Sequence, residues 1–269
     1  MHESRRLSRE TGSFVRVTPG SQSLARGIQV LRAFLEAAPS LSNSELVVRT
    51  HLPKATVSRL CRSLVDAGML EFDPDEEAYR LAPSSLSLGR AFQFSRSELG
   101  TVNGVLKTFA REHQVNVGLS APDHGHMVYV TTFRESRGAQ TRTVASGLRL
   151  PMATCSPGIA YLASANPKRR ATVYGVLETY HDRDWPAVRS TLEQNIADAI
   201  ARGYSQATSV FGNAGLGASV KGRGGAAYAV SASYLPSVGL PPDLTVEKLG
   251  EAIVALAHEL EKAWGGPQI

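Results

Sequence analysis

The segment from Pro53 to Gly68 carries the residues best suited to chemistry. Its letters are PKATVSRLCRSLVDAG, and proline suits the first position of a helix while glycine suits the position just past its end. Helical spacing gathers the apolar residues on one face: Val57, Leu60, Cys61, Leu64 and Val65. The opposite face carries Lys54, Ala55, Thr56, Ser58, Arg59 and Arg62. The pattern predicts an amphipathic helix with a small, polar and basic outer face.

Such a face is suited to reading double-stranded DNA. Small residues let a helix approach the major groove, and arginines are long enough to reach base edges. Lys54, Thr56 and Ser58 lie near the positive end of the helix, where they can donate to phosphates. Arg59 or Arg62 could pair with guanine through two hydrogen bonds. A small helical domain that binds another protein is the alternative.

Two preceding helices would position this face. Apolar residues recur at helical spacing from Leu24 to Leu35, and this helix should end before Pro39, because proline disfavours helical dihedrals in the residue before it. Ser42 or Asn43 can cap a short second helix, since either side chain accepts hydrogen bonds from first-turn amides. Together with the basic helix, these elements predict a helix-turn-helix.

A short hairpin is expected next. The stretches Met69–Phe72 and Ala78–Leu81 have the pattern of two strands around a turn. Carboxylates crowd this turn: Glu71, Asp73, Asp75, Glu76 and Glu77. Phosphate repulsion should keep the tip of this wing off the DNA backbone, so we expect Arg80 to contact DNA instead.

The distribution of charge supports a polyanion partner. The net charge is +5, and residues 1–62 hold ten Lys or Arg against four acids, which leaves +6 for this end and −1 for the remainder. A basic end on a near-neutral body favours nucleic acid as the partner, and a solvated charged tail is the alternative.

Length and composition indicate a folded protein with two cores, because 269 residues exceed the size of one usual domain and 42% of them are hydrophobic. No apolar run reaches the roughly 18 to 20 residues of a membrane-spanning helix, so we expect a cytoplasmic protein with no membrane partner. The two cysteines provide neither a disulfide framework nor a four-cysteine zinc site, which fits a reducing compartment.

The remaining chain predicts a sheet flanked by helices. Residues 84–113 have helical spacing with Gly89 and Gly100 as breaks, which indicates a linker and the first helix of a second domain. A hairpin is expected at 115–133, with its turn at residues 123–125, and a strand at 226–234. Helices are expected at 160–165, 169–177, 188–201 and 246–264. The fold class is α+β.

Two parts of the chain resemble one protein family. Residues 23–90 resemble the winged helix-turn-helix of the IclR family of bacterial transcription regulators, most specifically in LPKATVSRL and in Tyr79-Arg80-Leu81. The glycine usual in that family before this Tyr is Ala78 here. RTVASGLRLPMATCSPGIAYLAS from Arg142, RGYS from Arg202 and YAVSASYLP from Tyr228 are similar to the family's effector-binding domain, whose fold resembles GAF domains.

The resemblance implies a domain order and a set of partners. We expect a flexible basic arm at 1–22, a winged helix-turn-helix domain at 23–83, a linker helix at 84–96 and an effector-binding domain at 97–265. The partners would be a near-palindromic operator DNA, a small-molecule effector, and a second copy in a homodimer or tetramer. No cofactor is expected.

The resemblance also implies an effector site. Ser156 can cap the helix that begins at Pro157-Gly158, whose free amides and positive end favour an anion. Ser231 and Ser233 lie on one strand face, as the serines at the matching family positions do, and can donate into the same cavity. The alternative is that these serines satisfy local backbone groups. The full expected set is Leu148, Met152, Cys155, Ser156, Gly158, Phe211, Asn213, Ser231 and Ser233.

Two departures from the family pattern bear on the ligand. Ile159 stands where the family usually has Lys, and residues 208–213 replace the acidic residues usual before the glycine-containing strand. These changes predict a more neutral pocket, in which Phe211 could stack on an aromatic ligand and Asn213 could hydrogen-bond to it. The resemblance implies a repressor or activator of a catabolic operon that senses an aromatic or carboxylate metabolite.

Three other interpretations remain open. An enzyme could use Cys155 as a nucleophile near a helix N-terminus, but the sequence marks no base beside it, so we expect no catalysis. His124 and His126 form a thin metal signal, since tetrahedral zinc needs two further ligands and only Asp123 is near in sequence; we expect no metal. A small-molecule sensor that acts through protein contacts, with the acidic wing used for docking, is the alternative function.

Overall fold

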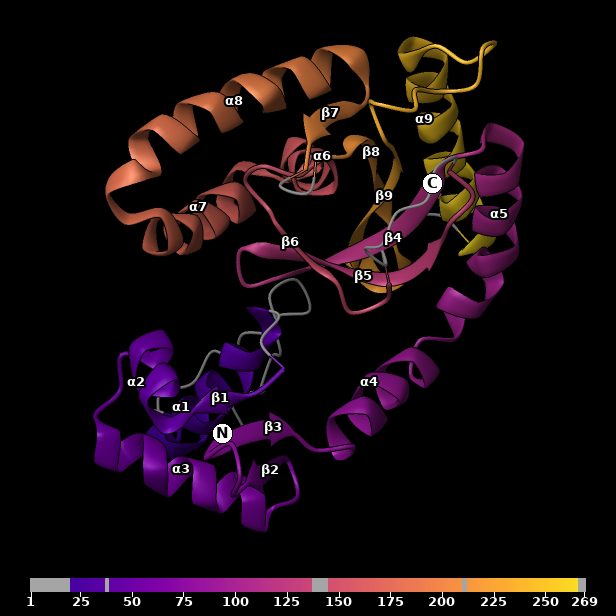
Figure 1. The fold of residues 1–269 in the computed structure, drawn as a ribbon. Coiled ribbons are helices and arrows are strands. Elements are labelled where there is room, and N and C mark those ends of the chain that lie inside the picture. Colours follow the sequence, from indigo (N-terminus) through magenta and orange to yellow (C-terminus); the bar gives the residue numbers. More distant parts are fainter. Residues whose placement is uncertain (1–19, 37–38, 137–144, 210–211, 266–269) are drawn as a thin grey trace, which may run out of the picture. The chain divides into compact units, whose positions relative to one another are not determined.

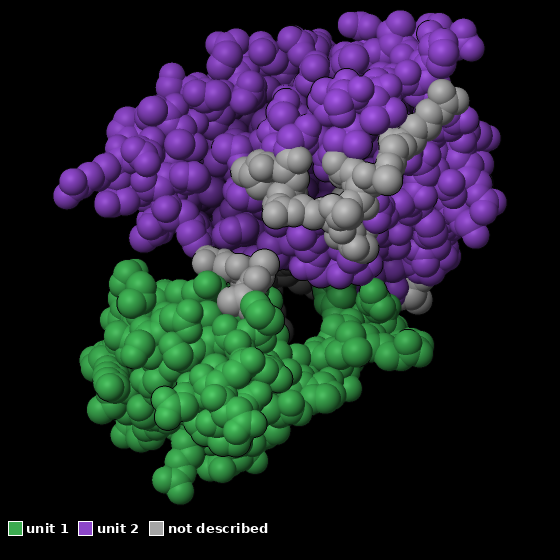
Figure 2. All heavy atoms as spheres, in the orientation of Figure 1, with its two compact units in different colours: residues 1–6, 14–95 green, residues 7–13, 96–269 purple. Residues whose placement is uncertain are grey.

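The computed structural model describes residues 20–36, 39–136, 145–209 and 212–265. The chain divides into two compact units, and among the described residues the first ends at Ser95 and the second begins at Arg96 (Figure 2). None of the described helices is both long enough and apolar enough to span a bilayer. The expected arm at 1–22 lies almost entirely outside the described residues.

The first unit is a helix-turn-helix followed by a wing (Figure 1). Its helices are α1 (Gln22–Ala33), a 3-10 turn (Phe34–Glu36), α2 (Asn43–Thr50), α3 (Lys54–Asp66) and α4 (Ser84–Phe94). Its strands are β1 (Leu41–Ser42), β2 (Leu70–Asp73) and β3 (Ala78–Leu81), paired antiparallel in the order β1-β3-β2.

Local chemistry explains where these helices begin and end. The Ser42 hydroxyl accepts from the Glu45 amide and the Glu45 carboxylate accepts from the Ser42 amide, so a capping box starts α2. Ser42 Oγ also donates to Glu45 Oε2 at 2.7 Å, and this hydrogen bond, followed by the one from the Ser42 amide, holds the pKa of Glu45 below its ordinary value. After α3, Gly68 takes a positive φ of 67°, a conformation that glycine adopts without strain. The predicted cap at Ser42 and the end of α3 before Gly68 are confirmed, whereas Pro53 takes the N-cap position of α3 and not its first helical position.

The second unit is an antiparallel sheet covered by helices (Figure 1). Its strands are β4 (Asn116–Asp123), β5 (His126–Phe133), β6 (Arg149–Pro151), β7 (Ser205–Thr208), β8 (Ala214–Lys221) and β9 (Ala227–Tyr234). Its helices are α5 (Ser97–His113), α6 (Ser156–Ser164), α7 (Pro167–His181), α8 (Trp185–Arg202) and α9 (Val246–Ala263), with short 3-10 turns at Asp182–Asp184 and Arg223–Gly225. The strand order is β6-β5-β4-β9-β8-β7.

Two apolar cores lie in this unit. One packs residues of α5 and α9 with residues of β4, β8 and β9, and includes Leu106, Leu119, Ile253 and Trp264. The other packs residues of α6, α7 and α8 with residues of β5 and β6, and includes Met127, Ile159, Leu177 and Leu192. The predicted α+β class is confirmed.

Two expectations about helix boundaries are wrong. Gly89 and Gly100 lie inside α4 and α5, and the chain leaves the helix at Ser95 and Arg96 instead. A single glycine costs a helix only about 1 kcal/mol, which neighbouring residues can offset. Ser156 is also not the cap of α6: the cap position is Cys155, it provides no side-chain hydrogen bond, and Ser156 is already helical.

Candidate nucleic-acid interface and ligand cavity

The outer face of α3 is arranged as the sequence predicts. Val57 and Cys61 are fully buried in the core of the first unit. The residues expected to reach DNA are exposed, except for Thr56, which is half-buried; the exposed ones are Lys54, Ala55, Ser58, Arg59 and Arg62. The buried residues hold the helix in place, so its basic face can present a fixed pattern of donors.

A network of hydrogen bonds positions α3 against the preceding helices. Asn43 Nδ2 donates to Ser58 Oγ at 2.8 Å, which links the start of α2 to the outer face of α3. Because the Ser58 oxygen accepts here, its own O–H is available to donate to a phosphate. Arg49 Nη1 donates to the Ala33 carbonyl at 2.8 Å and so ties α2 to α1. Sequence reasoning considered Asn43 only as a cap and missed this contact.

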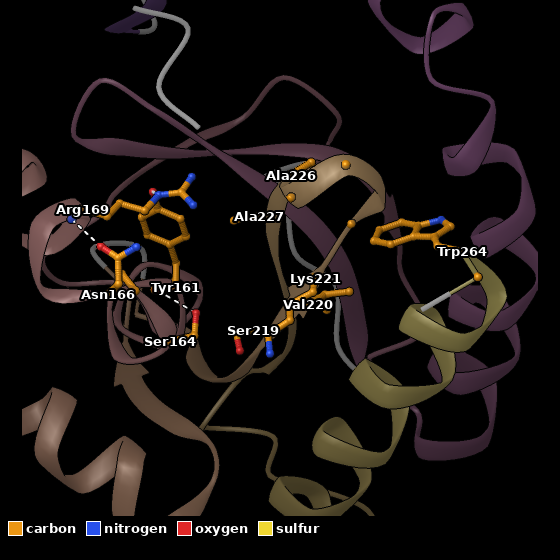
Figure 3. A pocket seen from close by; sticks show the side chains of 15 residues that line it. Tyr161, Ser164, Asn166, Arg169, Ser219, Val220, Lys221, Ala226, Ala227 and Trp264 are labelled. Carbon is orange, nitrogen blue, oxygen red and sulfur yellow. Dashed lines mark hydrogen bonds between the residues drawn. The ribbon is translucent and has the colours of Figure 1, made fainter. Parts of the chain in front are cut away.

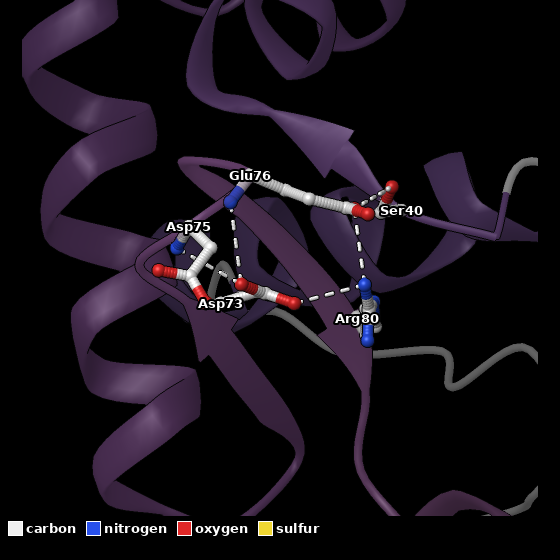
Figure 4. Close-up of polar contacts among 5 residues, drawn as sticks. All are labelled: Ser40, Asp73, Asp75, Glu76 and Arg80. Carbon is white, nitrogen blue, oxygen red and sulfur yellow. Dashed lines mark hydrogen bonds and ion pairs between the residues drawn. The ribbon is translucent and has the colours of Figure 1, made fainter.

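The wing holds Arg80 in ion pairs of its own (Figure 4). Arg80 Nη2 lies 2.9 Å from Asp73 Oδ2 and 3.0 Å from Glu76 Oε2. Asp73 Oδ1 also accepts from the Asp75 and Glu76 amides at 3.0 and 3.2 Å, and Ser40 Oγ donates to Glu76 at 3.2 Å. The hydrogen bond to Glu76 is the largest cause of a raised pKa at Arg80. Since both carboxylates engage the guanidinium, its expected DNA contact stays a prediction.

A small cavity opens at the N-terminal end of α6 in the second unit. Its volume is about 30 Å³, and its described lining residues are Tyr129, Leu148, Leu150, Cys155, Ser156, Pro157, Ala207, Ser209, Asn213, Gly215 and Ser233. None of these residues carries a formal charge. An anion here would therefore be stabilised by backbone amides and neutral donors at the start of the helix.

Glycines let the end of α6 come this close to the sheet. A Cβ built on Gly158 would lie 2.1 Å from the Met152 carbonyl oxygen, which is far inside contact distance. A Cβ on Gly215 would lie 2.7 Å from Ser156 Oγ. Ser205 Oγ donates to the Ser156 carbonyl at 2.7 Å and fastens the helix start to β7. These contacts fix the first turn of α6 at the cavity.

The expected effector residues divide into three groups. Those that line the cavity are Leu148, Cys155, Ser156, Asn213 and Ser233. Met152, Gly158 and Ser231 are buried and do not line it, and Gly158 serves the packing against Met152. Phe211 lies outside the described residues. Their roles toward a ligand remain predictions.

Ser231 is linked to the cavity through Tyr129, which sequence reasoning missed. The Tyr129 and Ser231 hydroxyls lie 3.1 Å apart, although β4 separates their strands. Gly118 on β4 pairs with Ser231, and a Cβ there would lie 2.5 Å from Tyr129 Cε1. The missing side chain thus lets the ring cross β4. Burial raises the pKa of Tyr129 to about 12, so its hydroxyl is neutral at physiological pH.

The structure removes the physical basis for a Cys155 nucleophile. Cys155 is 3% exposed, and burial raises the pKa of its thiol to about 12, whereas a nucleophilic cysteine needs a lowered pKa.

The possible metal ligands of the β4–β5 turn make other contacts: His124 Nδ1 lies 2.9 Å from Asp123 Oδ1, and Arg149 also pairs with that carboxyl group. Among the described residues, no group of three or more His, Cys, Asp or Glu side chains is arranged to hold a metal ion.

Comparison with known proteins agrees with this architecture. Residues 23–74 match the model of the IclR helix-turn-helix domain. The HTH-type transcriptional regulator TsaQ1/TsaQ2 of Comamonas testosteroni is 28% identical over 183 residues, which are 68% of this chain and 66% of that relative, just under two thirds of its length. Transcriptional repressor IclR of Escherichia coli is 23% identical over 192 residues, 68% of each chain.

Solved structures extend the similarity across both units. An IclR family transcriptional regulator from Brucella abortus is 26% identical with a TM-score of 0.77, over 91% of this chain and 93% of that one. An IclR homologue from Microbacterium hydrocarbonoxydans, solved in complex with 4-hydroxybenzoate, shares the fold at 20% identity and a TM-score of 0.65, over 91% and 99% of the two chains. The chain therefore carries an IclR helix-turn-helix domain at residues 23–74, and both of its units are similar to those of IclR family transcription regulators.

Proposed function

We propose that this regulator binds operator DNA through the outer face of α3 and that a small metabolite bound at the start of α6 changes its affinity for that DNA. The observation that carries the proposal is the exposed face of Lys54, Ser58, Arg59 and Arg62 over a buried anchor. A fixed helix with outward cations and small donors has the properties that major-groove recognition requires.

Each residue of this face has a proposed role. Lys54 and Ser58, in the first two turns of α3, donate to phosphates and set the register of the helix on the duplex. Arg59 and Arg62 reach base edges, where a guanidinium can pair with guanine O6 and N7. Ala55 allows close approach. We assign Arg80 to the wing, because its charge is matched there by Asp73 and Glu76.

We propose that the DNA-bound form is a homodimer. None of the residues of α4 is buried, and four of its large apolar side chains are exposed: Leu86, Leu88, Phe92 and Phe94. Exposed apolar residues at this density mark an interaction surface. A two-fold dimer formed through this helix would present two copies of α3, so the operator should be near-palindromic.

The proposed effector is a small carboxylate, aliphatic or aromatic, from a catabolic pathway. The first turn of α6 offers amides to an anion, and Ser209, Asn213 and Ser233 offer neutral donors. The cavity volume of about 30 Å³ holds about one water molecule, so an aromatic acid must displace side chains to enter. The similar structure that contains 4-hydroxybenzoate supports an aromatic acid as one candidate.

A fluorescence anisotropy titration tests the effector response. The full chain is titrated onto labelled DNA from its own upstream region, with and without a panel of aliphatic and aromatic acids. We expect one acid to shift the apparent affinity by a factor of about 5 to 150, the usual range of coupling between two sites. If no acid shifts specific binding, the ligand part of the proposal fails while the DNA part stands. If DNA does not bind specifically, a sensor that acts through protein contacts takes its place.

A further inference from the structure

A second, larger cavity in the second unit shares no lining residue with the cavity at the start of α6. Its volume is about 630 Å³, within the range of small-molecule sites. Its walls come from three places: the end of α6 and the start of α7, the β8–β9 hairpin, and the end of α9. Figure 3 shows Tyr161 and Arg169 on one side of the hairpin residues and the indole of Trp264 on the other.

The charge of this cavity is one-sided. Its charged residues, among the described lining, are Arg169 and Lys221, and no described lining residue is a carboxylate. Glu261 lies beside the hairpin, where its carboxylate accepts a hydrogen bond from the Lys221 backbone N–H at 2.8 Å. Glu261 does not line the cavity. Two cations around one concave surface favour an anionic ligand.

Arg169 is held at the wall by the residues around it. Its Nε donates to the Tyr161 hydroxyl at 2.7 Å, and its Cζ lies 5.1 Å from the centre of the Tyr161 ring. Its backbone N–H donates to Asn166 Oδ1 at 2.8 Å, which leaves the Asn166 amide hydrogens available as donors. A guanidinium fixed in this way can meet a carboxylate without a large loss of side-chain entropy.

The first turn of α7 is basic, which is unfavourable at the N-terminus of an isolated helix. Lys168, Arg169 and Arg170 follow Pro167, with no acid in the turn, although the positive end of a helix favours acids. Arg170 has a structural explanation, because it donates to the Leu162 and Ala163 carbonyls at the end of α6. Arg169 instead donates to the Tyr161 hydroxyl beside the cavity. An anion bound there would offset the repulsion between the charge of Arg169 and the helix dipole.

Part of the cavity wall is apolar, beside the polar residues Ser164, Asn166 and Ser219. Val220 and Trp264 are 1% and 2% exposed, and Ala226 and Ala227 complete this surface. We propose that this cavity is a second ligand site, which takes a small organic carboxylate with an apolar body, its carboxylate on Arg169 and Lys221 and its body along the apolar part of the wall that extends toward Trp264. The proposal is independent of the proposed function, since it uses no residue of α3 or of the cavity at the start of α6.

The two tryptophans of the chain provide a local readout. The full chain is labelled with 5-fluorotryptophan, and its two ¹⁹F signals are assigned with a Trp185→Phe variant. Trp185 packs on Tyr174 at 5.6 Å in the other core and reports on unrelated changes. Benzoate is the probe, and benzamide is its neutral control with the same ring. We expect benzoate to shift the Trp264 signal saturably and benzamide to shift it at least about tenfold more weakly.

Two independent variants and a control complete the test. Arg169→Gln and Lys221→Gln should each lower the affinity for benzoate, read from the Trp264 signal, by about tenfold, because each removes a charged partner of the carboxylate. Lys107→Gln, an exposed lysine of α5, should leave it unchanged. The proposal is overturned if benzoate does not shift the Trp264 signal, if benzamide shifts it equally, or if both variants respond as the unsubstituted chain does.

Discussion

The hydrogen bond between Tyr129 and Ser231 makes a quantitative prediction about the second unit. Ser231 is 2% exposed and Tyr129 is 7% exposed, so both partners of the hydrogen bond are buried from bulk water. Ser231→Ala leaves a buried phenol without its partner and should lower the free energy of unfolding by about 1 to 3 kcal/mol. Tyr129→Phe should cost about 1 kcal/mol, because a small serine hydroxyl is less expensive to leave unpaired. The double variant should cost less than the sum, by about 1 kcal/mol, since it removes both polar groups.

Urea unfolding followed by tryptophan fluorescence measures these energies. Trp185 and Trp264 both lie in the second unit, so the signal reports on its unfolding rather than on that of the first. Ser233→Ala, two residues further on the same strand, is half-buried and should cost at most about 0.5 kcal/mol. The reasoning is wrong if Ser231→Ala costs as much in the Tyr129→Phe background as in the unsubstituted chain, because the hydrogen bond would then contribute nothing.

Three further predictions follow from single contacts. Gly118→Ala should destabilise the second unit by about 1 to 3 kcal/mol, since its Cβ would lie 2.5 Å from Tyr129; an unchanged urea midpoint would contradict this. Arg59→Ala should weaken operator binding, measured by anisotropy, by about 1 to 3 kcal/mol and relax preference at one base pair. Arg80→Ala should change binding far less, because Asp73 and Glu76 engage its charge. Equal losses of binding free energy in the two variants would refute the assignment of Arg80 to the wing. Burial raises the pKa of the Cys155 thiol from an ordinary 9.0 to about 12, so iodoacetamide at pH 8 should alkylate it about a thousandfold more slowly in the folded chain than in urea. The free energy of unfolding should fall as the pH rises from 9 toward 12, because the thiol ionises first in the unfolded chain. Rapid alkylation of the folded chain would contradict the burial of Cys155.

The first unit could be predicted closely from its sequence. Pro53, Gly68 and the apolar spacing between them are local signals, and local signals suffice for a helix bounded by turn residues. The acidic turn of the wing is also visible in the sequence. What the sequence could not reveal was that Asp73 and Glu76 engage Arg80, because side-chain geometry decides which of several neighbouring acids an arginine meets.

The ligand cavity was less predictable, because its contacts join distant parts of the chain. Tyr129 and Ser231 are 102 residues apart, and they meet only because Gly118 on the strand between them has no side chain. The sequence predicts a strand at Gly118, but nothing local shows that the Tyr129 ring crosses the strand at this residue. Residue type favours Ser156 as the cap of α6, whereas the structure starts the helix one residue earlier, with Cys155 at the cap position. Such errors of one residue are common at helix ends.

Salt dependence of DNA binding tests the central claim most directly. The full chain is titrated onto DNA from its own upstream region and onto a scrambled sequence, at two salt concentrations. The α3 face predicts preference for the upstream DNA and a logarithmic salt slope of about −0.9 for each phosphate contacted, reduced by about 0.9 in Lys54→Gln. Equal binding to both sequences, or binding to the upstream DNA that does not weaken with salt, would contradict the account.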